Sequence, residues 1–140
     1  MNQRISDNAR YRILELCSKI NVCTGKKETL SKWGLDNYHI YLVHTDNEKY
    51  HDGFVITCNG IYRKKWNAHK NEAPFFVPFE DMARAIDIKY ESKYAFILVY
   101  PNQTETYLAY YDSKHREVGA IQLENLFRSI INICREDLFF

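Results

Sequence analysis

The segment DGFVITCNGIYRKKW, residues 52 to 66, carries three cations in a row. Arg63, Lys64 and Lys65 could bind phosphate groups or an acidic partner, because both need closely spaced positive charge. On a β-strand, Arg63 and Lys65 project to one face and Lys64 to the other. The alternative is a solvated strand face, where lysines also discourage association between sheet edges. The candidate anion- or partner-binding residues are Arg63, Lys64, Lys65, Trp66 and Lys70.

One polar loop gathers groups that could bind a cation or form an acid/base pair: His44, Asp46, Glu48 and His51. Hydrolytic metal sites usually combine two or three histidines at short, regular spacing with a carboxylate. No pair of histidines in the chain has the spacing i, i+2 or i, i+4. We therefore favour a plain hairpin loop and predict no metal ligands.

The sequence also gives little support for a nucleophilic catalytic residue. No serine lies in a Gly-x-Ser-x-Gly elbow, and the glycines form no phosphate-binding loop. The Gly60-Ile61-Tyr62 triplet lacks the second segment that a GIY-YIG nuclease needs. Cys58 with His39 or His44 is one arrangement to weigh, against the alternative of a buried thiol at a strand end. We expect no catalytic residues and no cofactor.

The cysteines also argue against a zinc site. No two of Cys17, Cys23, Cys58 and Cys134 are closer than six positions, whereas zinc ligands usually occur in pairs two to four residues apart. Cys17 and Cys134 fall on apolar helix faces, and Cys58 ends a predicted strand. Buried free thiols are the prediction.

Aromatic residues make up 15% of the chain, with 11 tyrosines and 8 phenylalanines. Alternation along the strands cannot bury all of them, and exposed tyrosines provide the contact area in which protein interfaces are enriched. The alternative is cross-strand pairing that stabilises the sheet itself. The candidate partner-interface residues are Phe75, Phe76, Tyr90, Tyr94, Tyr107, Tyr110 and Tyr111.

The elements that must position these residues begin with helices. Apolar residues recur every three or four positions in 8–22, which predicts a helix, and a short helical turn is expected at 28–33 before Gly34. The period then changes to two, which predicts strands at 38–44, 53–58 and 61–66. Asn59-Gly60 favours a type I′ turn between the last two strands.

The second half of the chain continues with strands and ends in a helix. A short edge strand is expected at 75–79, because proline cannot donate to a ladder, and 80–85 is a helical turn or the approach to a strand. Strands at 85–91, 94–101 and 106–112 should form a meander. A wide apolar stripe in 119–137 predicts an amphipathic helix that covers a sheet.

Length and composition fit one α+β domain over 1–140, with a helical segment at 1–34 and the sheet plus terminal helix at 36–137. We predict a curved antiparallel sheet or partly open barrel of about seven strands, with a capping C-terminal helix and an extra N-terminal helix. The net charge of +1 gives no support for global attraction to nucleic acid or anionic membrane.

Location and self-association are also expectations at this stage. No apolar stretch follows Met1, and no run approaches the roughly 18 apolar residues of a membrane span, so we expect a cytoplasmic protein. The apolar residues Leu138, Phe139 and Phe140 either pack onto the domain or mediate homo-oligomerisation.

The pattern over roughly 36–135 resembles bacterial pleckstrin-homology-like (PH-like) domains. Those domains often carry a segment of the form Gly, apolar, apolar, Thr, turn, Gly-Ile-Tyr, followed by an apolar, Pro/Tyr and acidic step. The matching positions here are Gly53, Phe54, Ile56, Thr57, Gly60, Ile61, Tyr62, Pro78, Phe79, Glu80 and Asp81. The resemblance implies a binding or scaffolding module without catalysis.

These observations together predict a non-enzymatic module that binds a protein. Contact would use the tyrosines of the meander, or a strand added at the edge formed by 75–79. An inhibitor or immunity protein of a partner enzyme is one specific form of this prediction. The alternative is an anion-binding module for phosphate-bearing lipid or nucleic acid, and a small metal-dependent hydrolase is a further alternative.

Overall fold

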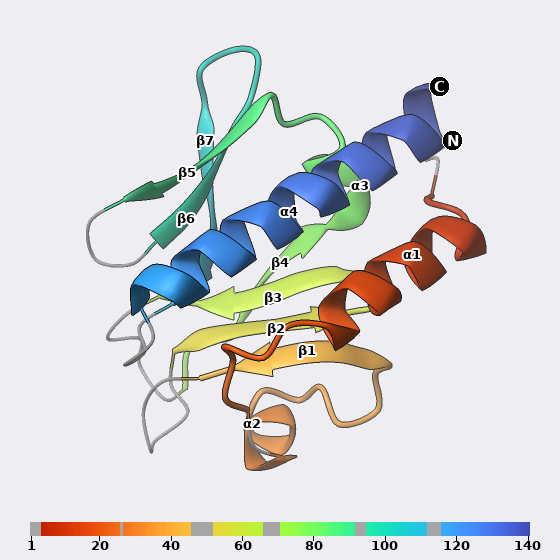
Figure 1. Ribbon diagram of the computed structural model, residues 1–140. Helices are drawn as coiled ribbons and strands as arrows, with labels where there is room; N and C mark the ends of the chain where they lie inside the picture. Colours follow the sequence, from red (N-terminus) through yellow and green to blue (C-terminus); the bar gives the residue numbers. More distant parts are fainter. Residues whose placement is uncertain (1–3, 26, 46–51, 66–70, 92–94, 112–115) are drawn as a thin grey trace.

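A computed structural model describes residues 4–25, 27–45, 52–65, 71–91, 95–111 and 116–140 (Figure 1). Its elements occur in the order α1 (Asp7–Ser18), α2 (Lys27–Lys32), β1 (Ile40–His44), β2 (Gly53–Thr57), β3 (Gly60–Lys64), β4 (Phe75–Pro78), α3 (Phe79–Met82), β5 (Asp87–Glu91), β6 (Ala95–Val99), β7 (Glu105–Tyr110) and α4 (Arg116–Phe139). The predicted α+β class and the antiparallel strand pairing are confirmed.

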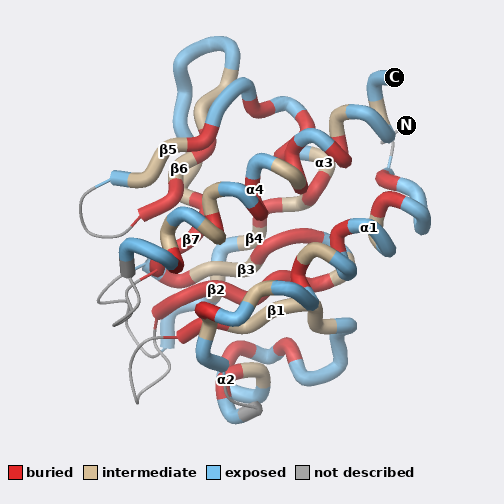
Figure 2. The backbone as a smooth tube through the Cα atoms, viewed as in Figure 1, coloured by how far each residue is buried: buried red, intermediate tan, exposed pale blue. Residues whose placement is uncertain are grey.

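The strands divide into two antiparallel sheets, in the orders β1-β2-β3-β4 and β5-β6-β7. The prediction was one curved sheet or a partly open barrel of about seven strands; the structure instead divides the strands between two sheets and is not a closed barrel. β4 lies at an edge, as its prolines predicted, and β5 to β7 form the expected meander. The central strand β2 is buried over its whole length (Figure 2).

The hairpin of β2 and β3 forms as predicted, but its turn differs. The last paired residues are Ile56 and Ile61, and Asn59 does not have the positive φ that a type I′ turn needs. The cause is a competing bond, because the Cys58 amide donates to the His39 carbonyl (3.0 Å). The Thr57 hydroxyl then accepts from the Asn59 amide at 3.1 Å and orders the wider turn.

Gly60 is required by this same turn. Its φ is +155°, and a Cβ there would lie 2.3 Å from the carbonyl oxygen of Val77 in β4. A side chain at this position would separate β3 from β4. The glycine that suggested a turn is therefore needed where the edge strand approaches.

Helix α4 confirms the predicted capping helix and extends beyond it at both ends. Its ribbon crosses both sheets in Figure 1. The Phe127 ring lies 5.8 Å from the Phe54 ring of β2 and 5.1 Å from the Phe96 ring of β6, measured between centroids. Phe127 is fully buried, so one aromatic side chain contacts both sheets.

Helix α1 is shorter than the predicted 8–22, because it ends at Ser18. The amide of Ile20 bonds to the Cys17 carbonyl, which tightens and closes the last turn. The carbonyl of Val22 is then free to accept the buried Tyr111 hydroxyl at 3.0 Å. The apolar pattern continues to Val22, but the helix ends earlier, because the Val22 carbonyl bonds to Tyr111 from a distant part of the chain.

Helix α2 agrees with the predicted turn at 28–33 and supports a second, smaller core. Trp33 and Leu35, which follow it, pack with Val55 of β2. Val55 points away from the main core, which holds Phe54 and Ile56. The four-stranded sheet is therefore covered on both faces, by α4 and α1 on one and by the α2 region on the other.

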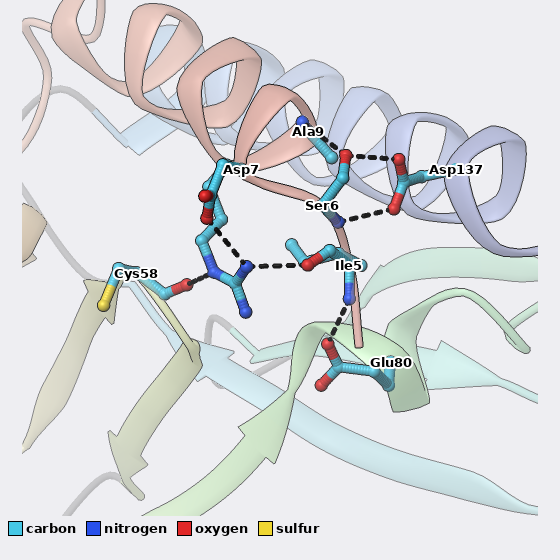
Figure 3. A network of polar contacts seen from close by, with 8 residues as sticks. Ile5, Ser6, Asp7, Ala9, Cys58, Glu80 and Asp137 are labelled. Atoms are coloured by element: carbon cyan, nitrogen blue, oxygen red, sulfur yellow. Dashed lines mark hydrogen bonds and ion pairs between the residues drawn. The ribbon is translucent and has the colours of Figure 1, made fainter. Parts of the chain in front are cut away.

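A polar network fixes the start of α1 to distant parts of the chain (Figure 3). The Asp137 carboxylate of α4 accepts from the Ser6 amide at 2.7 Å and from the Ser6 hydroxyl at 2.5 Å. The Ile5 amide donates to Glu80 of α3 at 2.9 Å. Arg10 Nε donates to the Cys58 carbonyl at 2.9 Å. These bonds attach one helix end to α3, α4 and the β2–β3 turn.

The last residues divide between packing and exposure. Leu138 contacts the main core, whereas Phe139 and Phe140 are 52% and 94% exposed. Self-association through these phenylalanines stays a prediction. Among the described residues, no helix combines the length and apolar character needed to cross a membrane.

Replacing Asp137 by alanine should lower the free energy of unfolding by about 1 kcal/mol, because it removes two hydrogen bonds from a charged acceptor to Ser6. Urea unfolding followed by circular dichroism measures this change. Glu136→Ala is the matched control, since that carboxylate makes only an exposed ion pair with Arg12 (3.6 Å), worth about 0.5 kcal/mol or less. Equal losses in the two variants would contradict the proposed role of Asp137.

Candidate functional site: a cationic and aromatic surface

Arg63 lies where the two sheets meet. It faces Phe75 across the β3–β4 ladder, and its guanidinium carbon is 4.3 Å from the centre of the Phe75 ring. The centre of the Tyr107 ring of β7 lies 5.0 Å from the same carbon. Arg63 Nε also donates to the Tyr107 carbonyl at 3.1 Å. The guanidinium thus contacts two aromatic rings and is fixed by a hydrogen bond.

Lys65 lies on the same side of the chain as Arg63, as strand alternation predicted. Its Nζ is 5.7 Å from the centre of the Tyr107 ring, and the residue is exposed. Two cations therefore share one aromatic ring. Burial lowers the pKa of Arg63, and the charges of Tyr107 and Glu72 partly oppose this shift.

Lys64 points to the opposite face. It is only 3% exposed, and its Nζ lies 5.3 Å from the Trp33 ring centre, over the second core. Burial lowers its pKa as well. The three cations therefore do not converge on one anion site. Trp66 and Lys70, the other two predicted members, lie outside the described residues.

An aromatic row lies on the same side of the four-stranded sheet as the second core. Tyr62 of β3 and Phe76 of β4 are opposed in the ladder and their rings stack at 4.5 Å. The Tyr38 ring meets Tyr62 edge-on at 5.7 Å and is 42% exposed. Burial, together with a side-chain hydrogen bond to Tyr38, raises the pKa of Tyr62 to about 12.

These two groups of side chains meet at the edge strand β4, where Phe75 and Phe76 point to opposite faces. We call the combined surface the β3–β4 margin. Its members are Tyr38, Tyr62, Arg63, Lys65, Phe75, Phe76 and Tyr107. Phe75 is 49% exposed although it contacts Arg63, so much of this apolar ring faces solvent. Aromatic residues and arginine are the types in which interface hot spots are enriched.

The backbone edge of β4 is a poorer site for an added strand. The Phe79 amide donates to Asn59 of the β2–β3 turn, so by alternation Phe76 and Pro78 direct their backbone outward. Pro78 has no N–H, and neither does Pro74. Within β4 the outward donor is the Phe76 amide, and a partner strand needs several. Side-chain contact fits this edge better than strand addition does.

Two predicted interface residues are corrected by their burial. Tyr110 is 2% exposed and Tyr111 is fully buried, so neither side chain can provide contact area. A register shift between Phe96 and Ile97 leaves Leu108 unpaired, and simple alternation does not continue past it. Tyr90 is half-buried against Phe96 at 4.6 Å, as in cross-strand pairing. Tyr94 lies outside the described residues.

The predicted acid/base loop has one described histidine, and it lies in the interior. His44 is fully buried, and its Nδ1 accepts the Thr24 amide at 3.0 Å. Residues 46–51, which hold the other members of the loop, lie outside the description. Over the described ranges, no three His, Cys, Asp or Glu side chains come together as a metal site.

The cysteines agree in part with the prediction of buried thiols. Cys17 and Cys134 are buried, and burial raises the pKa of each thiol to about 12. Cys58 is half-buried, and its backbone groups are bonded to His39 and Arg10. Reactive thiols usually have a depressed pKa, so Cys17 and Cys134 are unsuited to nucleophilic chemistry.

An open hollow of about 680 Å³ lies away from the margin, between α3 and the turn from β6 to β7. Its charged lining residues are Asp81 and Arg84, and Tyr100, Asn102 and Thr104 are among the others. The hollow thus presents one carboxylate, one guanidinium and neutral hydroxyl and amide groups. This set does not combine a nucleophile with an adjacent general base, as a catalytic site would. This hollow was not predicted from the sequence, because its lining residues, which fall within 81–84 and 100–106, come together only in the folded chain.

Comparison with protein families, with curated proteins and with solved structures finds no match to the chain. The resemblance to PH-like domains therefore stays a prediction.

Replacing Tyr62 by phenylalanine should remove an absorbance step near pH 12 from the alkaline titration at 295 nm, because the Tyr62 pKa is raised to about 12. The folded state favours neutral Tyr62. Its contribution to stability is therefore present below the ordinary tyrosine pKa of about 10 and is lost as pH rises from there to about 12. Tyr38→Phe should move the step to lower pH. A Tyr62 step near pH 10 in the folded protein would contradict this environment.

Proposed function

We propose that this protein is a non-catalytic module that binds a protein partner through the β3–β4 margin. The observation that carries the proposal is the Arg63 guanidinium, which contacts the rings of Phe75 and Tyr107 while Phe75 stays 49% exposed. An exposed aromatic ring on a fixed cation is a surface ready for contact. No enzymatic step is needed to explain this arrangement.

Pre-ordering makes the margin a favourable binding surface. A free arginine side chain loses roughly 0.5 to 1.5 kcal/mol of conformational entropy when an interface immobilises it. The hydrogen bond to Tyr107 and the two ring contacts already restrict Arg63. Phenylalanine and tyrosine rings add large apolar area with few rotatable bonds. Binding would therefore cost less ordering here than on an average polar surface.

The order of the elements supports the predicted PH-like character. Seven described strands in two antiparallel sheets are followed by one long helix that covers both of them. The resemblance implies binding without catalysis, and we propose it on that basis. In this view the protein acts in the cytoplasm, and an inhibitor or immunity protein of a partner enzyme is the specific form we propose.

The anion-binding alternative has weaker support. Phosphate-bearing polymers are usually held by several cations on one face, since each neutralised phosphate needs its own charge. Here Lys64 points away from Arg63 and Lys65 and lies over Trp33. Two described cations of the run remain on a common face. A metal-dependent hydrolase has less support still, because His44 is buried with Nδ1 occupied.

Replacing Phe75 by alanine should weaken binding of the partner about tenfold or more, because truncating an interface hot spot typically costs more than about 1.4 kcal/mol. Affinity capture from the native host identifies the partner, and calorimetry with the purified partner measures the dissociation constant. Ile121→Ala is the matched control, since Ile121 is an equally apolar residue, 63% exposed on α4. Unchanged affinity of Phe75→Ala would overturn the use of this surface.

The dependence of affinity on salt concentration distinguishes protein binding from the anion-binding alternative. An interface dominated by aromatic contact should lose little affinity between 50 and 200 mM NaCl, whereas a site contacting six to ten phosphates would lose roughly a thousandfold or more. The same purified complex serves for this measurement. A steep salt slope that disappears in Lys65→Gln would favour the anion-binding module.

A further inference from the structure

The cations of the margin have no acidic partner among the described residues, in contrast to Lys89 and Arg128. Lys89 of β5 is bonded to both Glu91 (2.8 Å) and Glu105 (2.6 Å). Arg128 of α4 is paired with Asp87 and Glu124. Arg63 and Lys65, within the described part of the chain, contact aromatic rings and one backbone carbonyl instead of a carboxylate.

A row of side chains runs from Lys89, whose charge is neutralised by two glutamates, to Arg63, which has no bonded carboxylate among the described residues. Lys89, Ile97 and Tyr107 are opposed across β5, β6 and β7, and Arg63 and Phe75 continue the row onto β3 and β4. Carboxylates of the same chain neutralise the Lys89 end. At the Arg63 end, Glu72 lowers the net potential but forms no ion pair among the described residues. Charge complementarity is therefore incomplete at one end of the row.

The free part of the guanidinium suits a carboxylate. Arg63 Nε is occupied by the Tyr107 carbonyl, whereas Nη1 and Nη2 have no hydrogen bond to any described residue. Paired N–H groups of this kind hold a carboxylate with defined geometry. The rings of Phe75 and Tyr107 lie against the half-buried guanidinium, and a charge-assisted hydrogen bond is stronger where solvent is partly excluded.

We propose that the β3–β4 margin receives an acidic segment of the partner protein, in which an Asp or Glu carboxylate binds Arg63 and Lys65 and a neighbouring apolar side chain packs on Phe75. This inference rests on the proposed function and specifies its partner. A peptide carboxylate fits better than a phosphate polymer, since one carboxylate needs one or two cations and the margin has two. It also accounts for an apolar ring directly beside the charge.

A displayed library of random 12-residue peptides tests this inference. Peptides are selected on the full-length protein, and those still bound by Phe75→Ala are discarded, which leaves ligands of the margin. We expect enrichment of Asp or Glu next to aromatic or large aliphatic residues. Lys65→Glu should weaken the selected peptides at least about tenfold, and changing their acidic residues to amides should do the same.

Matched variants keep the test interpretable. We change Lys65 and not Arg63, because replacing Arg63 by glutamine would remove its hydrogen bond to Tyr107 and loosen the contact between the sheets. Lys65 is exposed, so Lys65→Glu should fold. Lys19→Glu makes the same charge change at an exposed position just after α1, outside the margin, and should leave binding unchanged. Heteronuclear NMR of the labelled protein then locates each peptide on the surface.

Three results would overturn the inference, and they differ in what they say of the proposed function. Peptides that need Phe75 but are neither acidic nor weakened by Lys65→Glu would refute the acidic segment and leave protein binding intact. No peptide that depends on Phe75 would refute both. Tighter binding of phosphoinositide vesicles or a single-stranded oligonucleotide, lost in Lys65→Glu, would replace the peptide by a phosphate ligand.

Discussion

The fold depends on joining two sheets that share no backbone ladder. Hydrogen bonds run within β1-β2-β3-β4 and within β5-β6-β7, so side chains must hold one sheet against the other. The main joint is apolar, with Phe127 of α4 between Phe54 and Phe96. Full burial of one such side chain contributes roughly 1.5 to 3 kcal/mol, and the rest of the α4 stripe adds to it. Helix α4 thus holds the two sheets together by packing against both of them.

Arg63 supplies a second, polar joint between the sheets, and the surface that we propose for partner binding includes this same residue. Its hydrogen bond to the Tyr107 carbonyl ties β3 to β7, and contacts with the Phe75 and Tyr107 rings restrict the guanidinium. A side chain that holds two sheets together cannot rearrange freely, so it presents constant geometry to a ligand. Lys64, one position later, instead stabilises the second core through Trp33. Neighbouring cations therefore have different tasks because strand alternation separates them.

Much of the architecture could be predicted, because periodicity and proline act locally. The hairpin of β2 and β3, the edge position of β4, the meander and the capping helix all follow from such signals. The type I′ turn failed because the Cys58 amide bonds to His39, a contact that local sequence does not encode. The interface role of Tyr110 and Tyr111 failed because both faces of the chain are covered there, with Leu108, Ala109, Tyr110 and Tyr111 all buried in succession. The contact of Arg63 with Tyr107 joins residues far apart in sequence, and no local pattern indicates it.

The bonds from Ser6 to Asp137 bring the first and last helices together at one corner of the domain (Figures 1 and 3). Strand β3 runs away from this corner, so the Arg63 region faces another side. A short flexible linker from Phe140 back to Arg4 would therefore span little space, and the chain could be cyclised or circularly permuted without crossing the β3–β4 margin. The same arrangement lets the domain be inserted into, or attached to, another polypeptide through a single narrow attachment point.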